Sequence, residues 1–397
     1  MLTVRTSINR TTRMKKRICL ILPVQSPYWT ERLKALVQYE ELEIILLLER
    51  DSFTHRPGWQ PESIKNVSIH VLGSMVTNEV KKSDDLGYRF HGIRSIPWLL
   101  TTELFRRRPD VVVLCNATQL IFTLPAKWLL GIRIALIVED TPHAARHRSL
   151  FARKVKQLLY KQVDCCYAFS DDSRLFLGQM GITDNVVRSS WSVDMIRFKR
   201  LETDASQATT GIINMRTVTF VGALVTGKGI LQLLAAWKEL STKVRQSAQL
   251  LVVGSGPLQC ELQKIIDNNA LTEVRLLGQK SYSEVIELLK KSDLFVLPTL
   301  QDLYSLTVLE AMACGCPVIT TPFNGARELV DERINGWIVN PTEPGMLTAV
   351  LERALSNHVD LNKMGAAARL RVECMDNTIV IEQFSQSLQN LVAGNAR

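Results

Sequence analysis

The stretch that decides the fold is residues 296–322, VLPTLQDLYSLTVLEAMACGCPVITTP. Its first three residues are typical of the end of a buried strand, and the polar run TLQDLY then breaks the apolar pattern. Apolar residues return at helical spacing from Ser305 until Gly315 and Pro317 stop the helix, and a second β-type run begins at Val318. The stretch therefore predicts a strand–helix–strand step of a parallel sheet.

The start of that helix is a candidate anion site. The first N–H groups of a helix lack intrahelical partners, and the helix dipole favours negative charge there, so a diphosphate would suit it. Asp302 lies just before the helix and Glu310 lies on it, so both carboxylates could face one ligand. The structural alternative is that Asp302 caps the helix while Glu310 lies on a solvated face. The candidate backbone donors are those of Tyr304, Ser305, Leu306 and Thr307.

Length and composition indicate a two-domain globular protein. The chain has 397 residues, 46% of them hydrophobic and 22% charged, which excludes disordered and fibrous classes. No apolar run reaches the roughly 18 residues that a membrane-spanning helix needs. The eight cysteines include the pairs Cys165–Cys166 and Cys314–Cys316 but form no CxxC motif. Reduced thiols in a cytosolic compartment are therefore expected, rather than disulfides or zinc.

The positive charge is concentrated in the first half of the chain. Residues 1–200 carry 31 Lys and Arg against 19 Asp and Glu, a net +12, while the remainder carries 17 against 20, a net −3. Nucleic acid, an anionic lipid surface and a phosphorylated acceptor are all compatible with that charge. This half lacks aromatic interleaving or a recognisable nucleic-acid module, so we expect no nucleic-acid partner.

The order of the apolar runs predicts an α/β fold with two units. Strand and helix patterns alternate across residues 17–199, which favours a parallel, doubly wound sheet with its ligands at the carboxyl ends of the strands. Residues 200–214 are mostly polar and small and are expected to be the linker. The pattern restarts across 215–375, and 376–397 is expected to be a final helix. The expected strands are 17–23, 42–48, 67–71, 111–115, 132–138, 163–170, 218–221, 250–253, 274–277 and 294–298.

Residues 1–16 are predicted to be a disordered basic extension. They lack the apolar core of a secretory signal, although a transit peptide has a similar composition.

A basic helix is expected after the strand at 132–138. The sequence Glu-Asp-Thr-Pro-His at 139–143 closes that strand, and apolar residues then cover one side of a helix, with Arg153 and Lys156 roughly opposite. The charged side is either a solvated face or a patch for an acceptor phosphate or a membrane surface. The apolar residues are Leu150, Phe151, Val155, Leu158 and Leu159; the basic run is Arg146, His147, Arg148, Arg153, Lys154, Lys156 and Lys161.

A glycine-containing loop opens the second half. Between Gly222 and Gly229, glycines let backbone N–H groups approach a phosphate, and Lys228 supplies positive charge. The loop lacks the ending of a P-loop. The later Gly254-Ser255-Gly256 has Gln259 where a dinucleotide fingerprint needs glycine, so NAD binding is not expected.

These motifs together resemble a known family. One pattern consists of an acid, seven residues and Glu-Ala-Met-Ala-x-Gly-x-Pro-Val, followed by Gly325, Glu328 and Asn-Gly at 335–336. It resembles the nucleotide-sugar site of retaining glycosyltransferases of the GT-B fold, closest to glycosyltransferase family 4, the glycosyl transferases group 1. The resemblance covers nearly all of residues 17–392 and is strongest over 218–340. It implies two Rossmann-like domains facing a central cleft, with the final helix crossing back onto the first.

The resemblance also implies roles for particular residues. In the family, the diphosphate is neutralised by a cation at the place of Lys228, donor-sugar hydroxyls bind the first acid, here Asp302, and ribose hydroxyls bind Glu310. His143 matches loosely a residue that approaches the reacting sugar. The remaining donor-binding positions are Gly222, Gly278, Gln279 and Lys280, the last three beside the base, and the N–H groups of residues 304–307.

Two positions depart from the family pattern. Asp302 stands where a glutamate is usual, and Ala223 stands where an arginine accompanies the lysine. The Gly-Gly loop that many relatives have after the first strand is also absent.

The expected function is transfer of a sugar from a UDP- or GDP-sugar to a glycan or a lipid-diphosphate-linked acceptor, with retention of configuration, in cell-surface polysaccharide biosynthesis. No cofactor and no metal are expected, since no Asp-x-Asp occurs. The expected location is cytoplasmic, with peripheral association with an anionic membrane surface on its inner face. The alternatives are a catalytically silent nucleotide-sugar-binding protein and a sugar-nucleotide epimerase of similar fold.

Overall fold

The computed structural model describes residues 15–51, 61–83, 89–146, 149–199, 215–356 and 359–394. The expected linker at 200–214 and most of the expected extension at 1–16 therefore lie outside the described residues, as do His147 and Arg148 of the basic run.

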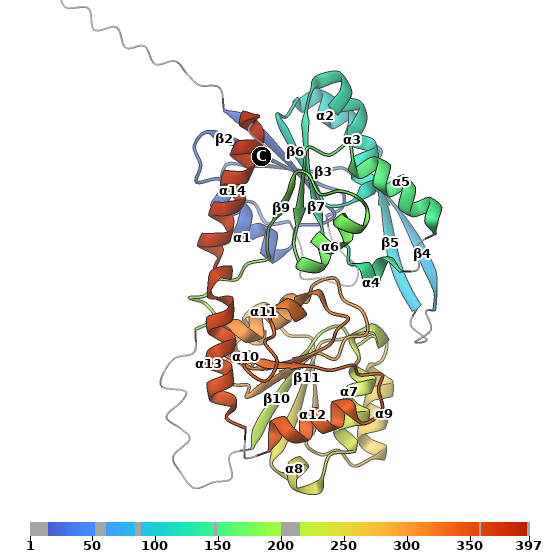
Figure 1. Ribbon diagram of the computed structural model, residues 1–397, viewed down its shortest axis with the longest axis vertical. Helices are drawn as coiled ribbons and strands as arrows, with labels where there is room; N and C mark the ends of the chain where they lie inside the picture. The colour runs from blue at the N-terminus through green and yellow to red at the C-terminus, as the bar shows by residue number, and fades with distance from the viewer. Residues whose placement is uncertain are drawn as a thin grey trace, which may run out of the picture.

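The first domain is built on a parallel sheet of seven strands in the order β3-β2-β1-β6-β7-β8-β9 (Figure 1). The central strands read as unbroken apolar runs because helices cover both faces of the sheet. The strands are β1 (Lys16–Leu22), β2 (Leu42–Leu48), β3 (Val67–Val71), β6 (Val111–Leu114), β7 (Arg133–Val138), β8 (Cys165–Ala168) and β9 (Val186–Arg188). The helices are α1 (Pro27–Leu36), α2 (Leu100–Arg107), α3 (Ala117–Leu130), α4 (Pro142–Ala145), α5 (Leu150–Tyr160) and α6 (Asp171–Gln179).

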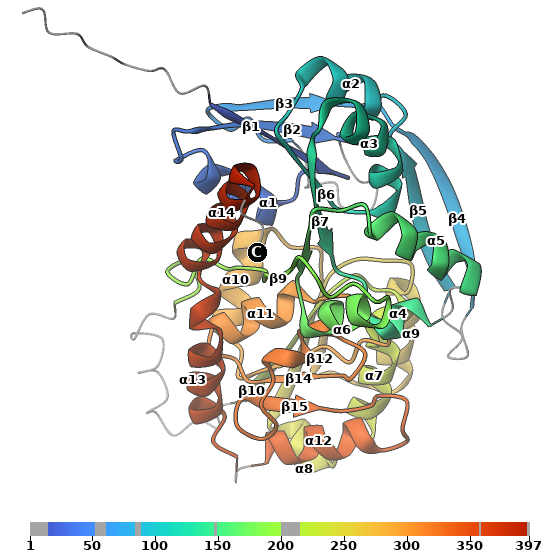
Figure 2. The same cartoon turned by 45° about the horizontal axis from the view of Figure 1, so that its top comes forward.

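An antiparallel hairpin interrupts this domain. It consists of β4 (Met75–Ser83) and β5 (Arg89–Ile96), and both views place it beside α5 (Figures 1 and 2). No strand is expected at 75–96 from the sequence.

The second domain repeats the architecture with a parallel sheet of six strands in the order β12-β11-β10-β13-β14-β15. The strand–helix–strand step expected from residues 296–322 is β13 (Leu294–Val296), α11 (Leu306–Ala313) and β14 (Val318–Thr320), with β13 and β14 paired in parallel. The other strands are β10 (Arg216–Val221), β11 (Ala248–Val253), β12 (Val274–Gly278) and β15 (Gly336–Ile338). The helices include η3 (Thr226–Lys228), α7 (Ile230–Lys238), α8 (Thr242–Gln246), α9 (Gln259–Asn268), α10 (Tyr282–Lys290), η4 (Gly325–Leu329), α12 (Met346–Leu355), α13 (Leu361–Val372) and η5 (Glu373–Met375).

The last helix, α14 (Asn377–Ala393), returns to the first domain (Figure 1). The ring of Phe384 packs against Trp29 and Tyr167, and the hydroxyls of Tyr167 and Ser387 are 2.9 Å apart. Two Rossmann-like domains that face each other, joined by this returning helix, confirm the expected α/β fold class. No helix within the described ranges is long and apolar enough to cross a membrane.

Helix α5 exposes most of its apolar side instead of burying it. Leu150, Phe151 and Leu158 are exposed, and Tyr160 is the only buried residue of the helix. On the other side of the helix, Lys156 forms an ion pair with Asp140, which follows β7, so that this lysine points toward the domain. Of the two alternatives for the charged side, a solvated face is therefore excluded for Lys156.

Candidate functional site

Helix α11 begins at the interface between the domains without a side-chain cap. Its N-cap residue Ser305 donates its hydroxyl to Asp302 instead of accepting a bond from the helix, while the Ser305 N–H donates to Asn324 at 3.2 Å. Because no side chain caps the first turn, the positive end of the helix dipole remains available to an anion. The expected backbone donors at residues 304–307 surround this helix start.

Asp302 and Lys228 lie together beside this helix end. The ammonium group of Lys228 and the hydroxyl of Ser305 both donate to Oδ2 of Asp302. The side chains of Asp302 and Lys228 are 14% and 28% exposed, so the pair is partly buried but still reached by solvent. The backbone of Asp302 is fixed by its N–H bond of 3.0 Å to the carbonyl of Phe323. The structure thus brings the expected sugar-binding acid into contact with the expected phosphate-binding cation.

The loop that carries Lys228 is fastened to the strand end that precedes Asp302. The Thr299 hydroxyl donates to the Gly227 carbonyl at 2.7 Å, and the Leu300 N–H donates to the same oxygen at 2.9 Å. Gly229 has φ +71°, and a Cβ there would lie 1.8 Å from the carbonyl oxygen of Pro298. Only glycine permits this close approach, which sets the distance between Lys228 and Asp302.

The other expected donor-binding residues lie along the same sheet edge. Gly222 follows β10 and donates its N–H to Val253, and Gly254 donates to the carbonyl of Gly278 at the end of β12. The side chain of Gln279 accepts a bond of 3.3 Å from Ser255. Lys280 is ion-paired with Glu284 at 3.3 Å on the surface, so its side chain is engaged away from Lys228.

Glu310 is buried and contacts the first domain. It is 1% exposed, and the hydroxyl of Tyr28 on α1 donates to its Oε1 at 2.9 Å. Burial raises the pKa of Glu310 to about 7, although hydrogen bonds from Tyr28 and Tyr282 and the charge of Arg197 act in the opposite direction. The alternative that placed Glu310 on a solvated helix face is therefore excluded.

Tyr28 and Tyr282 were not identified from the sequence as site residues. Their rings meet edge to face at 6.1 Å, and with Asp194 and Arg197 they line a cavity of about 320 Å³ between the domains. The sequence carries no motif for this contact, since Tyr28 is a helix-start residue 282 positions before Glu310.

His143 and Glu139 bring the end of β7 to the same interface. The ring of His143 stacks on Phe323 at 4.8 Å between centroids with an interplanar angle of 26°. Phe323 is the residue whose carbonyl binds the Asp302 N–H, so His143 reaches the loop that holds Asp302. Burial and the charges of Asp140 and Asp302 raise the pKa of Glu139 to about 7, although a hydrogen bond from Trp191 and the charge of Arg32 act in the opposite direction. The sequence pointed to this strand end but not to Glu139 as a titrating group.

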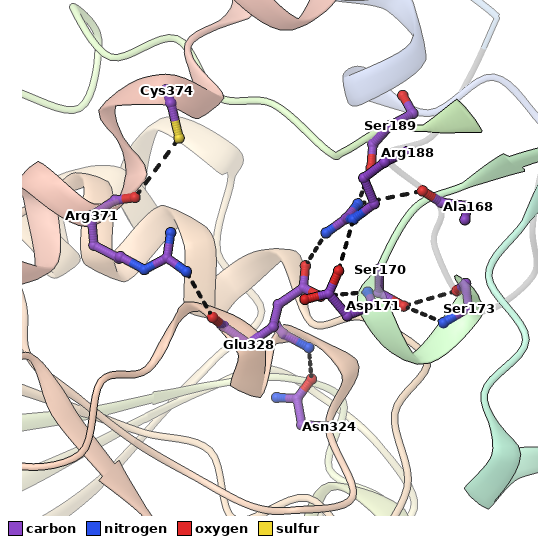
Figure 3. Close-up of polar contacts among 11 residues, drawn as sticks. Ala168, Ser170, Asp171, Ser173, Arg188, Ser189, Asn324, Glu328, Arg371 and Cys374 are labelled. Carbon is purple, nitrogen blue, oxygen red and sulfur yellow. Dashed lines mark hydrogen bonds and ion pairs between the residues drawn. The ribbon is translucent and has the colours of Figure 1, made fainter. Parts of the chain in front are cut away.

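An ionic cluster around Glu328 holds the two domains together (Figure 3). Glu328 on η4 accepts a bond of 2.6 Å from the N–H of Asp171 and forms an ion pair of 2.6 Å with Arg188, both in the first domain. Next to it, Arg327 forms an ion pair of 2.7 Å with Asp172. These contacts join η4 to α6 and β9 and so fasten the two domains together, and Arg371 of α13 donates a bond of 3.0 Å to the carbonyl of Glu328 in the same cluster.

Within the part of the chain that the structure describes, no group of three or more His, Cys, Asp or Glu side chains is placed to hold a metal ion.

Comparison with known proteins adds a family match and structural neighbours. Residues 206–371 match the family model of the glycosyl transferases group 1. The amylovoran biosynthesis glycosyltransferase AmsK of Erwinia amylovora is 31% identical over 148 residues, which cover 35% of this chain and 36% of the relative. A GDP-mannose-dependent monoacylated alpha-(1-6)-phosphatidylinositol monomannoside mannosyltransferase of Corynebacterium glutamicum is 32% identical over 192 residues, or 46% of this chain and 50% of the relative. The chain thus matches these relatives over half of their length or less.

Among solved structures, Anabaena Alr3699/HepE in complex with UDP superimposes with a TM-score of 0.72 at 18% identity, covering 94% of this chain and 100% of that one. At that identity the match shows the fold alone. The sequence match to the glycosyl transferases group 1 thus covers residues 206–371, and the chain as a whole has the GT-B fold.

Proposed function

We propose that this chain is a glycosyltransferase that moves a sugar from a UDP- or GDP-sugar to a glycan or lipid-linked acceptor, with retention of configuration. The observation that carries the proposal is the arrangement of Lys228, Asp302 and buried Glu310 around the uncapped start of α11. A cation and helix N–H groups suit a diphosphate, and the two carboxylates suit sugar and ribose hydroxyls.

Donor binding would exchange contacts that the residues of the site make with one another. The diphosphate competes with Asp302 for Lys228, which frees the Asp302 carboxylate for a hydroxyl of the donor sugar. A ribose hydroxyl likewise takes the place of the Tyr28 hydroxyl at Glu310. Each exchange replaces one charge-assisted hydrogen bond by another. The carboxylates of Asp302 and Glu310 therefore keep a hydrogen-bond partner both before and after the donor binds.

The chemical step needs stabilisation of the leaving diphosphate. Lys228 and the start of α11 supply positive charge where negative charge develops as the anomeric bond breaks. For retention, the leaving phosphate oxygen accepts the proton of the acceptor hydroxyl on the same face of the sugar, so a dedicated base is not required. The countercharge in this scheme comes from the protein itself, and we therefore propose that neither a metal nor a cofactor is needed.

The relatives support both donor classes and a surface-glycan role. The Anabaena neighbour was solved with UDP, while the Corynebacterium relative is named for GDP-mannose and a phosphatidylinositol mannoside. The Erwinia relative is named for amylovoran biosynthesis. We infer a role in polysaccharide or glycolipid assembly at the cytoplasmic face of a membrane.

A thermal-shift panel of UDP-, GDP- and ADP-sugars, each with and without EDTA, tests the donor. The expected result is stabilisation by a UDP- or GDP-sugar that EDTA leaves unchanged. A shift abolished by EDTA would contradict the metal-free site, and the absence of any shift would contradict donor binding.

Product analysis of the same donor separates the alternatives. Donor consumption only in the presence of an acceptor is expected. Binding without turnover across an acceptor panel would identify a silent sugar-nucleotide-binding protein. Isomerised donor without any acceptor would identify an epimerase.

A further inference from the structure

The loop before α11 and the helix η4, which carries Glu328 of the ionic cluster, are bonded to each other. The Asp302 N–H donates to the carbonyl of Phe323 at 3.0 Å, and the Gly325 N–H donates back to the carbonyl of Asp302 at 3.3 Å. A Cβ at Gly325 would lie 1.9 Å from the carbonyl oxygen of Leu303, so glycine is needed for this close approach. A displacement of the loop that holds Asp302 is therefore passed to the start of η4.

Asn324 makes a second connection between the same two elements. Its side chain is fully buried, and its Oδ1 accepts the N–H of Ser305 at 3.2 Å and the N–H of Ala326 at 3.1 Å. Ser305 is the N-cap residue of α11, and Ala326 lies in the first turn of η4. One buried amide thus holds the N-terminal ends of both helices.

Tyr304, which precedes the N-cap of α11, directs a polar group toward the ionic cluster. Tyr304 is 8% exposed, and its hydroxyl makes no hydrogen bond of good geometry among the described residues. Burial raises the pKa of Tyr304 well above its ordinary value, and Glu328 raises it further through its charge and a weak hydrogen bond. A buried hydroxyl that lacks a good acceptor is unfavourable, and Glu328 is the acceptor beside it.

The Glu328 carboxylate can accept a stronger bond from Tyr304. Its Oε1 accepts a bond from Arg188 and its Oε2 accepts one from the N–H of Asp171, each at 2.6 Å (Figure 3). Because a carboxylate oxygen has two acceptor sites, each of these oxygens can take a further donor. Arg188 and Asp171 belong to the first domain, whereas Tyr304 belongs to the second. A bond from Tyr304 would hold the carboxylate in the position from which it binds the first domain.

A diphosphate at the start of α11 would change the contacts on both sides of Tyr304. The carboxylate of Asp302 accepts bonds from Lys228 and from the hydroxyl of Ser305. In the proposed function, the diphosphate binds Lys228 and the N–H groups of the helix start. Since Asp302 and Ser305 flank the segment that carries Tyr304, their release reaches the tyrosine directly.

We propose that Tyr304 is a positioning residue that couples the diphosphate site at the start of α11 to the ionic cluster around Glu328. When a diphosphate binds, the bond from the Tyr304 hydroxyl to Glu328 shortens, and the carboxylate holds the first domain more firmly. Coupling between two sites is reciprocal, so an intact cluster strengthens diphosphate binding by the same factor. The identity of the ligand as a nucleotide rests on the proposed function, whereas the coupling needs only the diphosphate group.

Calorimetric titration of the full chain with UDP, GDP and inorganic pyrophosphate tests the coupling. Tyr304→Phe keeps the ring and removes the hydroxyl, and Arg188→Gln removes one partner of Glu328. Each variant is expected to weaken binding of all three probes by about threefold to tenfold. The double variant should bind no more weakly than the weaker single variant, because both changes act through one carboxylate. Arg188→Lys, which keeps the charge, should recover part of the affinity.

Matched controls separate this coupling from a general loss of structure. Tyr39→Phe removes a hydroxyl outside the site, and Arg174→Gln removes an exposed arginine of α6; both should bind the probes as the wild type does. Binding of UMP, which lacks the second phosphate, should change by less than about twofold in Tyr304→Phe. The Tm of ligand-free Tyr304→Phe should stay close to that of the wild type, because its bond to Glu328 is weak without the diphosphate.

Hydrogen exchange of the Asp171 amide reports on the cluster itself, since this N–H donates to Glu328. Pyrophosphate should slow its exchange in the wild type but not in Tyr304→Phe.

Several outcomes would overturn the coupling. Effects of Tyr304→Phe and Arg188→Gln that multiply in the double variant would show that the two residues act independently. Unchanged Asp171 exchange in the wild type on pyrophosphate binding would show that the cluster does not respond to the ligand. A lowered Tm of Tyr304→Phe with unchanged affinity would assign the hydroxyl to folding alone.

Failure of the proposed function gives a different pattern. A wild type that binds pyrophosphate with the expected coupling, but binds neither UDP nor GDP, would contradict nucleotide-donor binding and leave the coupling intact. Binding of none of the three probes would overturn both proposals.

Discussion

The hydroxyl of Tyr28 in the first domain donates a hydrogen bond of 2.9 Å to Oε1 of Glu310 in the second. The Glu310 carboxylate is almost completely buried, so this bond satisfies an acceptor that water does not reach freely. In the proposed function, a ribose hydroxyl needs the same oxygen. Under that proposal, Tyr28 and the ribose hydroxyl compete for Glu310, so donor binding is expected to separate the two side chains.

Replacing Tyr28 by phenylalanine tests this coupling. The ring contacts with Trp191 and Tyr282 remain, but the hydrogen bond to Glu310 is lost. We expect the free energy of unfolding of the donor-free protein to fall by about 1–2 kcal/mol. Since the donor-bound state does not contain this bond, calorimetry should show tighter donor binding. Tyr39→Phe serves as a control outside the site, and weaker binding by Tyr28→Phe would mean that Tyr28 contacts the donor directly.

The pKa of Glu310 predicts a pH dependence of donor binding. Burial raises this pKa to about 7, so the carboxylate is ionised above that pH and protonated below it. An ionised carboxylate is the stronger acceptor for ribose hydroxyls, and donor affinity should therefore fall on acidification, by up to about tenfold per pH unit below 7. Glu310→Gln should bind more weakly and show no such titration. Glu310→Ala should lose about 2–3 kcal/mol of binding free energy. A pH profile in Glu310→Gln identical to that of the wild type would assign the titration to another group, such as Glu139.

The sequence was informative where one local segment carries both the structure and the chemistry. The helix of residues 306–313, its stop at Gly315 and the positions of Asp302 and Glu310 all follow from one continuous stretch. The Tyr28–Glu310 bond depends on how two domains dock, and no local pattern encodes that. The pairing of Lys156 with Asp140 likewise joins two separate elements, and the periodicity of the helix alone does not predict it.

Lys228 should matter more for transfer than for stability. Its ion pair with Asp302 is partly exposed and contributes modestly to folding, whereas the leaving diphosphate needs its charge in the transition state. We expect Lys228→Ala to lower kcat/KM by about a hundredfold with little change in Tm. Lys238→Ala, an exposed lysine on α7, is the matched control. Unchanged turnover in Lys228→Ala would remove the loop from the mechanism.

Ala223→Arg tests the same loop in the opposite sense. An arginine there would restore the second positive charge of the family pattern, and donor affinity should increase. Weaker donor binding by a stably folded Ala223→Arg protein would show that this loop does not accommodate the family geometry.

Glu328 is expected to control how firmly the domains are closed. It pairs with Arg188 and with the N–H of Asp171 across the interface, and removal of its charge leaves Arg188 without that carboxylate. Glu328→Gln should give a larger radius of gyration in small-angle scattering and a lower Tm. Glu332→Gln, an exposed acid nearby in the sequence, should change neither. Unchanged scattering by Glu328→Gln would show that α14 and the Tyr28–Glu310 contact suffice to hold the domains closed.

The shorter acid at position 302 gives the sharpest test of the family geometry. Oδ2 of Asp302 accepts bonds from both Lys228 and Ser305, and the backbone of Asp302 is held by Phe323 and Gly325. If the loop keeps the geometry of relatives that have glutamate there, Asp302→Glu should preserve or raise transfer, because the longer side chain reaches further toward the donor sugar. Asp302→Asn should lower transfer, since the sugar hydroxyl loses a charged acceptor. Complete loss of transfer in a stably folded Asp302→Glu protein would show that the backbone of this loop has moved to suit the shorter side chain.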